Sequence, residues 1–256
     1  MPLQHLRALT RRARTPRSNL WLGAALCLVA GCVNSTGFLL VARFTSHMTG
    51  LVAATAQGAA DGRFGVAAIA ATGIGAFWSG AVLCTLTVRA ARRRHLHSEY
   101  ALPLGAESIA LLSIAFAPAL GLHVAPTLVF VTLCFAMGLQ NALISKLSRA
   151  EIRTTHVTGL ITDLGIEAAR WLDALLRDHP SKGPLKCERS ATLLCFLACF
   201  FMGSLLGALC FVQLGVAALA WPAILLAACA AMPILDDAWR YRLRARGNTN
   251  QREDGV

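Results

Sequence analysis

Long stretches without any charged residue set the pattern of this chain. None occurs between Arg17 and Arg43 or between Arg63 and Arg89, and two longer uncharged stretches cover residues 108–145 and 190–235. A helix needs about 20 apolar residues, at 1.5 Å per residue, to cross the hydrocarbon of a bilayer. The first two intervals each fit one membrane-spanning helix, and the longer two are each too long for one.

Helix-breaking residues divide the two longer stretches. Pro118, Gly121 and Pro126 interrupt the first of them and predict a tight hairpin between a third and a fourth helix. A weaker polar break at residues 213–215 separates a fifth helix from a sixth. An N-terminal signal peptide is the competing interpretation of the first apolar run, because arginines precede it. We favour a retained helix, since the run is long and five more follow.

Composition and charge agree with a membrane protein. The chain is 56% hydrophobic and 14% charged, with a mean hydropathy of +0.57, whereas soluble domains carry about 25% charged residues. Of its 24 Lys and Arg residues, 22 fall on one side of the membrane that the six predicted helices would cross, and only Arg43 and Arg63 fall on the other side. The positive-inside bias then places both termini in the cytoplasm.

Three sequence landmarks recur in the same order in the two halves of the chain. "GCVNSTGFLL" at 31–40 matches "GLQNALISKL" at 138–147, "SHMTGL" at 46–51 matches "THVTGL" at 155–160, and "FWSGAVLC" at 77–84 matches "FFMGSLLG" at 200–207. Each half then holds three predicted spans, and this odd number makes the second half enter the membrane inverted. Inverted repeats are typical of secondary transporters.

The predicted fold is an all-α membrane protein of six transmembrane helices in two inverted three-helix repeats. Short amphipathic or re-entrant helices follow the first and fourth spans. Repeat 1 covers residues 20–125, and repeat 2 covers 126–236 and includes a cytoplasmic loop at 148–189. A basic cytoplasmic tail, 1–19, precedes them, and a polar cytoplasmic tail, 237–256, follows.

The repeated polar residues are candidates for a substrate or ion pathway. Thr49 and Thr158 are predicted N-caps of the two short helices, whose positive ends would hold an anionic group if they were half inserted. The alternatives are that the caps only end their loops and that each histidine is satisfied locally. Because the inverted halves bring His47 and His156 in from opposite faces, we expect no shared metal site. The full set is Asn34, His47, Thr49, Asn141, His156 and Thr158.

Two acidic residues are further candidates. Asp163 lies in an amphipathic helix with Glu167 and Arg170 on its polar face and Trp171 on its apolar face. We expect this helix at the cytoplasmic interface, with Asp163 and Glu167 solvated or paired with Arg170. The alternative is that Asp163 faces a cavity and binds a proton or cation. Glu107, near the start of the third span, either is a functional intramembrane acid or reaches the lipid headgroups.

Small residues in the second and fifth spans predict close helix packing. Gly80, Gly203 and Gly207 are the packing candidates, and their matching faces suggest that the halves meet there. The nine cysteines form no C-x-x-C pair, and we expect them to be packing residues. The chain has no Walker loop, HExxH, GxSxG or paired catalytic carboxylates. We therefore predict no enzymatic activity, no metal and no cofactor.

Taken together, these motifs resemble the YoaK family of bacterial multi-pass membrane proteins, built on a domain of unknown function. The resemblance covers roughly residues 20–235 and is carried by "GCVNSTGFLL", "FTSHMTGL", "AMGLQNALISKL" and "EIRTTHVTGLITDLG". It implies a six-helix inner-membrane protein, described at most as a permease, with no substrate to carry over. Asn34 stands where family members often have an acid, and Leu51 where they often have asparagine. A neutral asparagine can form hydrogen bonds but cannot titrate, so the resemblance gives no support for a proton- or cation-linked role at residue 34.

Two functions from different classes stay open at this point. The first is a permease that moves a small, unidentified solute along a path lined by both Asn-loop-His-Thr-Gly elements. The second is a non-transporting membrane scaffold or sensor in which these motifs only stabilise loops. An intramembrane enzyme is the least favoured. The partners we expect are the lipid bilayer and a small-molecule or ion substrate, with no nucleic acid, and oligomerisation stays open.

Overall fold

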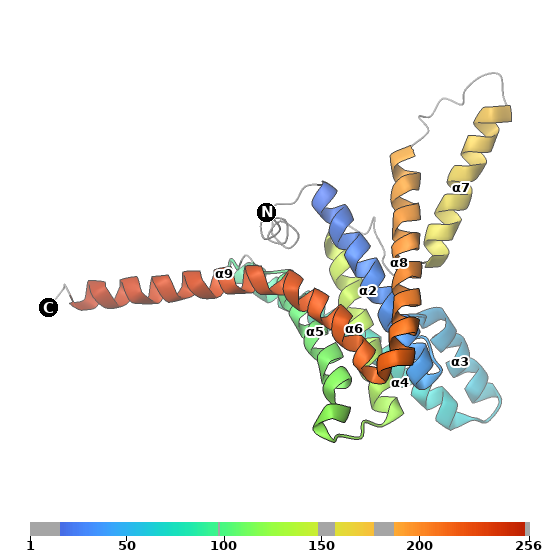
Figure 1. Cartoon of the computed structure of the whole chain (residues 1–256), viewed down its shortest axis with the longest axis horizontal. Coiled ribbons are helices and arrows are strands. Elements are labelled where there is room, and N and C mark those ends of the chain that lie inside the picture. Colours follow the sequence, from blue (N-terminus) through green and yellow to red (C-terminus); the bar gives the residue numbers. More distant parts are fainter. Residues whose placement is uncertain (1–15, 97, 148–156, 177–186, 254–256) are drawn as a thin grey trace.

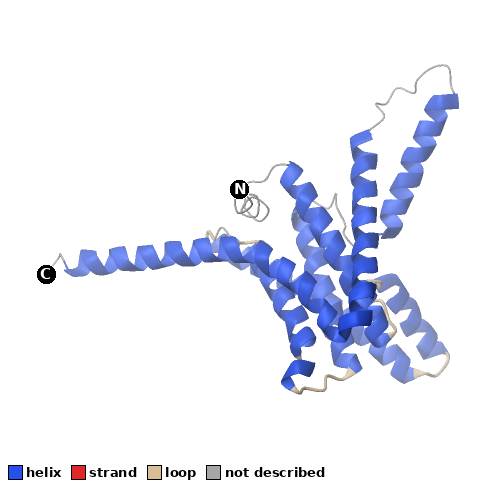
Figure 2. Ribbon diagram, in the orientation of Figure 1, coloured by secondary structure: helices blue, strands red, loops and turns tan. Residues whose placement is uncertain are grey.

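A computed structural model describes residues 16–96, 98–147, 157–176 and 187–253. All regular secondary structure in these ranges is helical (Figure 2). The elements are, in chain order, α2 (Pro16–Val41), α3 (Met48–Ala60), α4 (Phe64–Arg93), α5 (Ala101–Phe116), η1 (Pro118–Leu120), α6 (Pro126–Leu147), α7 (Val157–Leu176), α8 (Cys187–Leu214), η2 (Gly215–Leu219) and α9 (Ala220–Glu253).

Length and apolar composition make four helical stretches of the described chain candidate membrane spans. They are Leu20–Val41, Phe64–Arg93, Pro126–Lys146 and Glu188–Trp239. The last has 52 residues and contains α8, η2 and the first part of α9, which turn back on one another (Figure 1). α5 is also apolar but has only 16 residues. The prediction of an all-helical chain with several apolar, span-length helices is confirmed.

The predicted breaks fall where helices end. η1 begins at Pro118, Gly121 has a φ of +70°, and α6 begins at Pro126. Glycine adopts this left-handed conformation without the strain of a Cβ atom. The second break lies between α8 and η2, where Gly215 has a φ of +56°. Both turns join helices that run in opposite directions (Figure 1).

Two helix pairs form the centre of the bundle, α2 with α8 and α4 with α6. Figure 1 shows α2 and α8 side by side. Each pair takes one helix from residues 20–125 and one from residues 126–236. A large apolar cluster fills the space between these helices, α5 and α9, and its fully buried members include Leu26, Val33, Leu104, Leu133 and Leu226.

Glycines bring the two helices of the first pair into backbone contact. A Cβ atom at Gly31 of α2 would lie 2.1 Å from the carbonyl oxygen of Phe200 in α8. A Cβ atom at Gly203 of α8 would lie 2.0 Å from the carbonyl oxygen of Leu28. No side chain fits in either space, so the two backbones pack directly on each other.

The second pair repeats these contacts at equivalent positions. A Cβ atom at Gly138 of α6 would lie 2.0 Å from the carbonyl oxygen of Phe77 in α4, and one at Gly80 would lie 2.1 Å from that of Phe135. Phe135 comes three residues before the glycine of its G-x-x-N motif, as Leu28 does in the first half. In both pairs, therefore, the G-x-x-N helix of one half packs on the F-x-x-G helix of the other.

Gly80 and Gly203 lie where the halves meet, but they do not face each other. α4 and α8 make no contact with one another along their described lengths, and each packs instead on the first long helix of the opposite half. Gly207 also packs on α2, where its Cβ atom would lie 2.8 Å from the Cα atom of Cys32. The alignment of the two halves identifies positions that are equivalent in sequence. It does not identify which positions are in contact in the folded bundle.

The two short helices pack beside the F-x-x-G helices, α3 on α4 and α7 on α8 (Figure 1). Leu160 near the start of α7 is buried in a small cluster with Cys27, Leu193 and Phe196. At the other end of α7 the Leu175 side chain is 81% exposed. α7 is thus anchored at its beginning and projects beyond the bundle at its end.

Candidate functional site

The connection between α2 and α3 gathers the polar residues of the first motif. The Oδ1 atom of Asn34 accepts hydrogen bonds from the Ser46 hydroxyl at 3.0 Å and from the Ser46 backbone N–H at 3.4 Å. Thr45 is fully buried, and its hydroxyl has no hydrogen-bond partner among the described residues. Asn34 therefore holds the loop against α2, which gives this asparagine a positioning role within the motif.

His47, not Thr49, occupies the N-cap position of α3. The helix begins at Met48, and the Leu51 N–H donates to the His47 carbonyl at 3.1 Å. Thr49 therefore lies inside the first turn, and the predicted threonine cap is wrong. The His47 side chain makes no capping bond. Its ring is exposed, lies edge-on to Phe44 at 6.5 Å between centroids and fills the space that a side chain at Gly50 would need.

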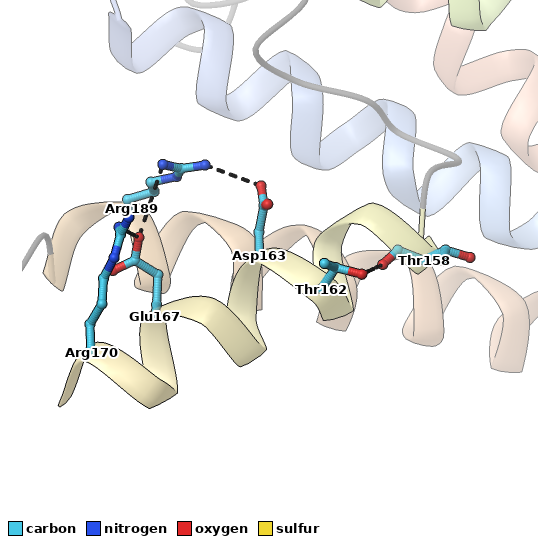
Figure 3. Close-up of polar contacts among 6 residues, drawn as sticks. All are labelled: Thr158, Thr162, Asp163, Glu167, Arg170 and Arg189. Carbon is cyan, nitrogen blue, oxygen red and sulfur yellow. Dashed lines mark hydrogen bonds and ion pairs between the residues drawn. The ribbon is translucent and has the colours of Figure 1, made fainter. Parts of the chain in front are cut away.

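The second motif shows the same correction. α7 begins at Val157, and the Thr162 hydroxyl donates to the Thr158 carbonyl at 2.9 Å (Figure 3). Thr158 is thus already a helical residue and not the N-cap. An N-cap has non-helical dihedral angles and precedes the first helical residue. His156, the other candidate of this motif, lies outside the described residues.

Asn141 and its neighbour Gln140 face different helices. Asn141 Nδ2 donates to the Met137 carbonyl of its own helix at 2.8 Å. Gln140 is fully buried, and its Nε2 atom donates to the Leu26 carbonyl of α2, which ties α6 to α2. Its Oε1 atom has no partner in the described part of the chain. Sequence reasoning missed Gln140, although an amide within an apolar span was a visible signal.

The acids of α7 form ion pairs (Figure 3). Asp163 accepts from Arg189 of α8 at 3.1 Å, and Glu167 accepts from Arg170 at 2.9 Å, with Arg189 a further 4.0 Å contact. Asp163 therefore pairs with Arg189 rather than Arg170, and its side chain is 41% exposed. This ion pair does not match the alternative in which Asp163 faces a cavity. Glu167, expected on the polar face, is instead buried between α7 and α8.

Glu107 of α5 has a different environment from the acids of α7. Its side chain is fully buried, and neither carboxyl oxygen has a hydrogen-bond partner among the described residues. The next residue, Ser108, donates to the Ala223 carbonyl of α9 at 2.7 Å. The Cys84 thiol of α4 lies within electrostatic range of both Glu107 and Lys146 of α6. Glu107 therefore does not reach a headgroup and lies inside the helix bundle.

A cavity of about 390 Å³ lies at the end of the bundle where α2 and α5 finish and α6 begins. It takes its walls from both halves of the chain, and most of them are apolar. His123 is the titratable residue of its lining, and the sequence analysis did not single it out. The lining residues are Leu40, Val41, Ile114, Pro118, Gly121, Leu122, His123, Val124, Pro126, Val129 and Val216.

Polar residues tie the α4–α5 turn together at the opposite end of the bundle. Arg92 donates from Nε to Glu99 at 2.9 Å and from Nη2 to the Tyr100 hydroxyl at 2.5 Å. Burial raises the pKa of the Tyr100 phenol. The Ser98 N–H donates to Asp237 of α9 at 2.8 Å. These bonds fix the turn to α4 and α9, so the arginine run of residues 92–94 includes a structural residue.

The structure divides the described candidate residues among separate places. Asn34, His47 and Thr49 lie at the α2–α3 connection, Asp163 and Thr158 lie on α7, and Glu107 lies in the interior. α3 packs on α4, α7 packs on α8, and neither short helix contacts α5 in the described chain. Among the described residues, no group of three or more His, Cys, Asp or Glu side chains is placed to hold a metal ion.

Comparison with known proteins gives a family without an assigned activity. No curated protein and no solved structure matches the chain. The profile of one family, described as "Protein of unknown function (DUF1275)", matches residues 22–232, which include the glycine contacts, Asn34, Glu107 and α7. The YoaK-like proteins that the motifs resemble fall within this family. The chain therefore belongs to the DUF1275 family.

Proposed function

We propose that this protein is a secondary transporter of a small solute in the bacterial inner membrane. In this proposal α2, α4, α5, α6, α8 and α9 are six transmembrane helices, arranged as two inverted repeats at residues 20–125 and 126–236. Both termini lie in the cytoplasm. The lipid bilayer and the solute are its partners, and it has no enzymatic activity.

The matched glycine contacts support the inverted repeat. Gly31 with Phe200 and Gly138 with Phe77 are equivalent contacts, as are Gly203 with Leu28 and Gly80 with Phe135. Contacts at such equivalent positions follow when two similar halves are related by a twofold axis. In inverted repeats that axis lies in the membrane plane, and transport sites form where the halves meet.

The distribution of basic residues supports the orientation. The six helices alternate in direction along the chain (Figure 1). The ends that carry Arg92 of α4, Lys146 of α6 and Arg189 of α8 therefore lie on the side where α2 begins. Arg43 and Arg63 lie at the opposite ends of α2 and α4. Basic residues concentrate on the cytoplasmic side of membrane proteins, which supports a cytoplasmic position for the start of α2.

The observation that carries the proposal is the difference between the two ends of the α2–α6 contact. On the cytoplasmic side of the middle of both helices, Gln140 of α6 bonds the Leu26 carbonyl of α2 in a fully buried position, and Leu22, Leu143 and Ile144 are buried further toward that end. At the outer end, Leu40 and Val41 of α2 and Val129 of α6 line the cavity of about 390 Å³. The contact is closed at one end and hollow at the other, as alternating access requires of an outward-facing state.

The glycine contacts identify the parts that would move. Backbones packed through Gly31 and Gly203, or through Gly80 and Gly138, have no side chains between them that could rearrange. Each glycine-linked pair should therefore move as one body, with α2–α6 as the surface between the two bodies. Breaking the Gln140 bond and closing the outer cavity would give the inward-facing state.

An uptake screen in proteoliposomes tests this proposal. We expect saturable uptake of one class of small solute by the wild type and loss of uptake in Gly138→Leu, which separates α4 from α6. Gly75→Leu is the matched control, because a side chain at Gly75 of α4 meets nothing within 4 Å. Absence of uptake for every solute tested, in vesicles where a reference transporter is active, contradicts the proposal.

A non-transporting scaffold or sensor is the second candidate, and α7 is the feature that favours it. Ile161, Leu172, Leu175 and Leu176 of α7 are exposed, so an apolar strip beside the ion-paired face is uncovered in the described chain. A scaffold would use this strip and would not need the α2–α6 contact to open. Unchanged function after Gln140 and Leu26 are joined by a disulfide through Gln140→Cys and Leu26→Cys would favour this second candidate.

A further inference from the structure

Glu107 differs from the other buried acids of the described chain. Glu99 accepts from Arg92, and Glu167 accepts from Arg170. Glu107 is as buried as they are, yet neither of its oxygens has a hydrogen-bond partner among the described residues. A carboxylate that only stabilised the fold would be expected to have a cation or hydrogen-bond donor of its own.

No cation of the described chain forms an ion pair with Glu107. Leu104 and Leu111, one turn away on either side along α5, are fully buried in the apolar cluster. The Cys84 thiol of α4 lies within electrostatic range of Glu107 and of Lys146 of α6, and Lys146 makes no ion pair with Glu107 within 4 Å in the described chain. From α9, Cys229 is buried in the same cluster, and Asp237 accepts a hydrogen bond from Ser98 in the α4–α5 turn.

The nature of the missing partner follows from these surroundings. An ionised carboxylate without a counter-charge carries a large desolvation penalty in an apolar interior. A metal cation would need several oxygen ligands around it, and the described neighbours of Glu107 supply apolar groups and a thiol. A proton needs only the carboxyl group itself.

We propose that Glu107 is a reversible proton-binding site and that the proton is the coupling ion of the transporter. The second part rests on the proposed function. Ile114 lines the outer cavity and lies two turns along α5 from Glu107, on the same buried face as Leu111. At 1.5 Å per residue this is about 10 Å. Movement at the α2–α6 contact that displaces Leu111 would expose Glu107 to water from the cavity and release its proton.

Labelling with a hydrophobic carbodiimide tests the site without any knowledge of the solute. A protonated carboxyl adds across one C=N bond: its proton goes to a carbodiimide nitrogen and its oxygen bonds to the central carbon. The acyl group then shifts to nitrogen, which leaves a stable N-acylurea and loses no atoms. We expect the full-length wild type in lipid vesicles to carry one such adduct, placed at Glu107 by peptide mass spectrometry. The labelling should fall as the pH is raised.

Controls make the result specific. Glu107→Gln should show no adduct, whereas Glu167→Gln should be labelled like the wild type, because Glu167 is paired with arginine. A wild type that remains unlabelled at every pH, or whose adduct maps to another carboxyl, overturns the proposal. The labelling result does not depend on the uptake screen. Failure of the uptake screen would contradict the transporter function and would leave Glu107 as a proton-binding site.

A stability measurement tests the same site in a second way. If the folded protein holds a proton that the unfolded chain releases, the unfolded state binds fewer protons, so raising the pH lowers the Tm. Glu107→Gln retains the shape of the protonated carboxyl and should remove this part of the pH dependence. A Glu107→Gln protein whose Tm falls with pH as steeply as that of the wild type contradicts the proposal.

Discussion

The two glycine-linked pairs share their contacts and differ one turn further along. In α8, Gly207 follows Gly203 by four residues and continues the close packing onto Cys32 of α2. At the equivalent place in α4, Cys84 follows Gly80 and is fully buried. The α2–α8 pair therefore stays in backbone contact over a longer distance than the α4–α6 pair.

This difference coincides with the position of Glu107. The Cys84 thiol lies within electrostatic range of Glu107, and Cys84 stands where the other half has a glycine. The glycine contacts that both pairs share hold the bundle together. The position at which the two pairs differ, Cys84, lies near the Glu107 carboxyl. In a duplicated fold, positions where the halves differ are therefore the better places to look for chemistry.

Replacement of the shared glycines should have the largest effect. Gly138→Leu and Gly31→Leu each force a side chain into a space already filled by a carbonyl group, which should destabilise the fold by roughly 3 kcal/mol or more. Thermal unfolding in detergent should show similar losses for the two, because their contacts are equivalent. Gly75→Leu should be close to neutral. A large loss for only one of the pair would break the equivalence of the two contacts.

Exchange of the two residues at which the pairs differ, Gly207 and Cys84, should have an intermediate effect on stability. Gly207→Cys gives α8 the residue found in α4, and its Cβ atom would lie 2.8 Å from Cys32 Cα, so we expect a loss of about 1–3 kcal/mol. Cys84→Gly leaves a cavity beside Glu107 and adds a glycine within a helix, with a loss of about 1–2 kcal/mol. Unfolding midpoints of both variants measure this, and an unchanged Gly207→Cys would show that the α2–α8 contact is looser than described.

The ion pairs of α7 allow a smaller, graded test. Arg170→Ala leaves the buried Glu167 carboxylate with Arg189 at 4.0 Å as its nearest described cation, so it should cost about 1–2 kcal/mol. Arg189→Ala removes a half-exposed bond to Asp163, and Glu167 keeps Arg170, so the loss should stay below about 1 kcal/mol. Limited proteolysis after α7 gives the order of the two effects. Equal sensitivity of both variants would show that Glu167 is not the main anchor.

Thr49 should matter least. An N-cap threonine replaced by alanine costs about 0.5–2 kcal/mol, but Thr49 lies within the first turn of α3. We therefore expect Thr49→Ala to change the stability by less than about 0.5 kcal/mol, whereas Ser46→Ala, which removes the hydroxyl bonded to Asn34, should lower it more. Unfolding in detergent compares the two. A larger loss of stability for Thr49→Ala than for Ser46→Ala would support Thr49 as the N-cap of α3.

The sequence predicted the apolar helices and the breaks between them, because a membrane-spanning helix imposes a simple rule on composition, but it did not predict that α9 continues to Glu253, into the expected polar tail of residues 237–256. Pro118, Gly121, Pro126 and Gly215 lie at the turns because these residues end helices for local reasons. The repeat was visible for the same reason, since Gly31 and Gly138 meet the same local demand for close packing. Their partners were not visible, because contacts between distant helices depend on how the whole bundle assembles.

The candidate site was predicted less completely. The start of α3 differs from the prediction by only two residues, yet that is enough to turn Thr49 from a cap into an ordinary helical residue. Glu107 was recognised as an acid in an apolar segment, but its lack of partners depends on α4, α6 and α9 together. Gln140 was overlooked because the sequence around a single amide in an apolar span does not show which backbone carbonyl that amide bonds.

The shortness of α5 has a consequence for hydration. At 16 residues, α5 is about 24 Å long and falls short of the roughly 30 Å of hydrocarbon in a typical bilayer. In the proposed six-helix arrangement the remaining depth would fall to η1 and the irregular chain that follows it, where Leu120 and Leu122 are exposed. Non-helical backbone at membrane depth needs either protein or water around its peptide groups. The cavity lined by Pro118, Gly121 and His123 is the place where that water would enter, so the proposed transporter would keep a wet, locally thinned patch of membrane at its outer surface.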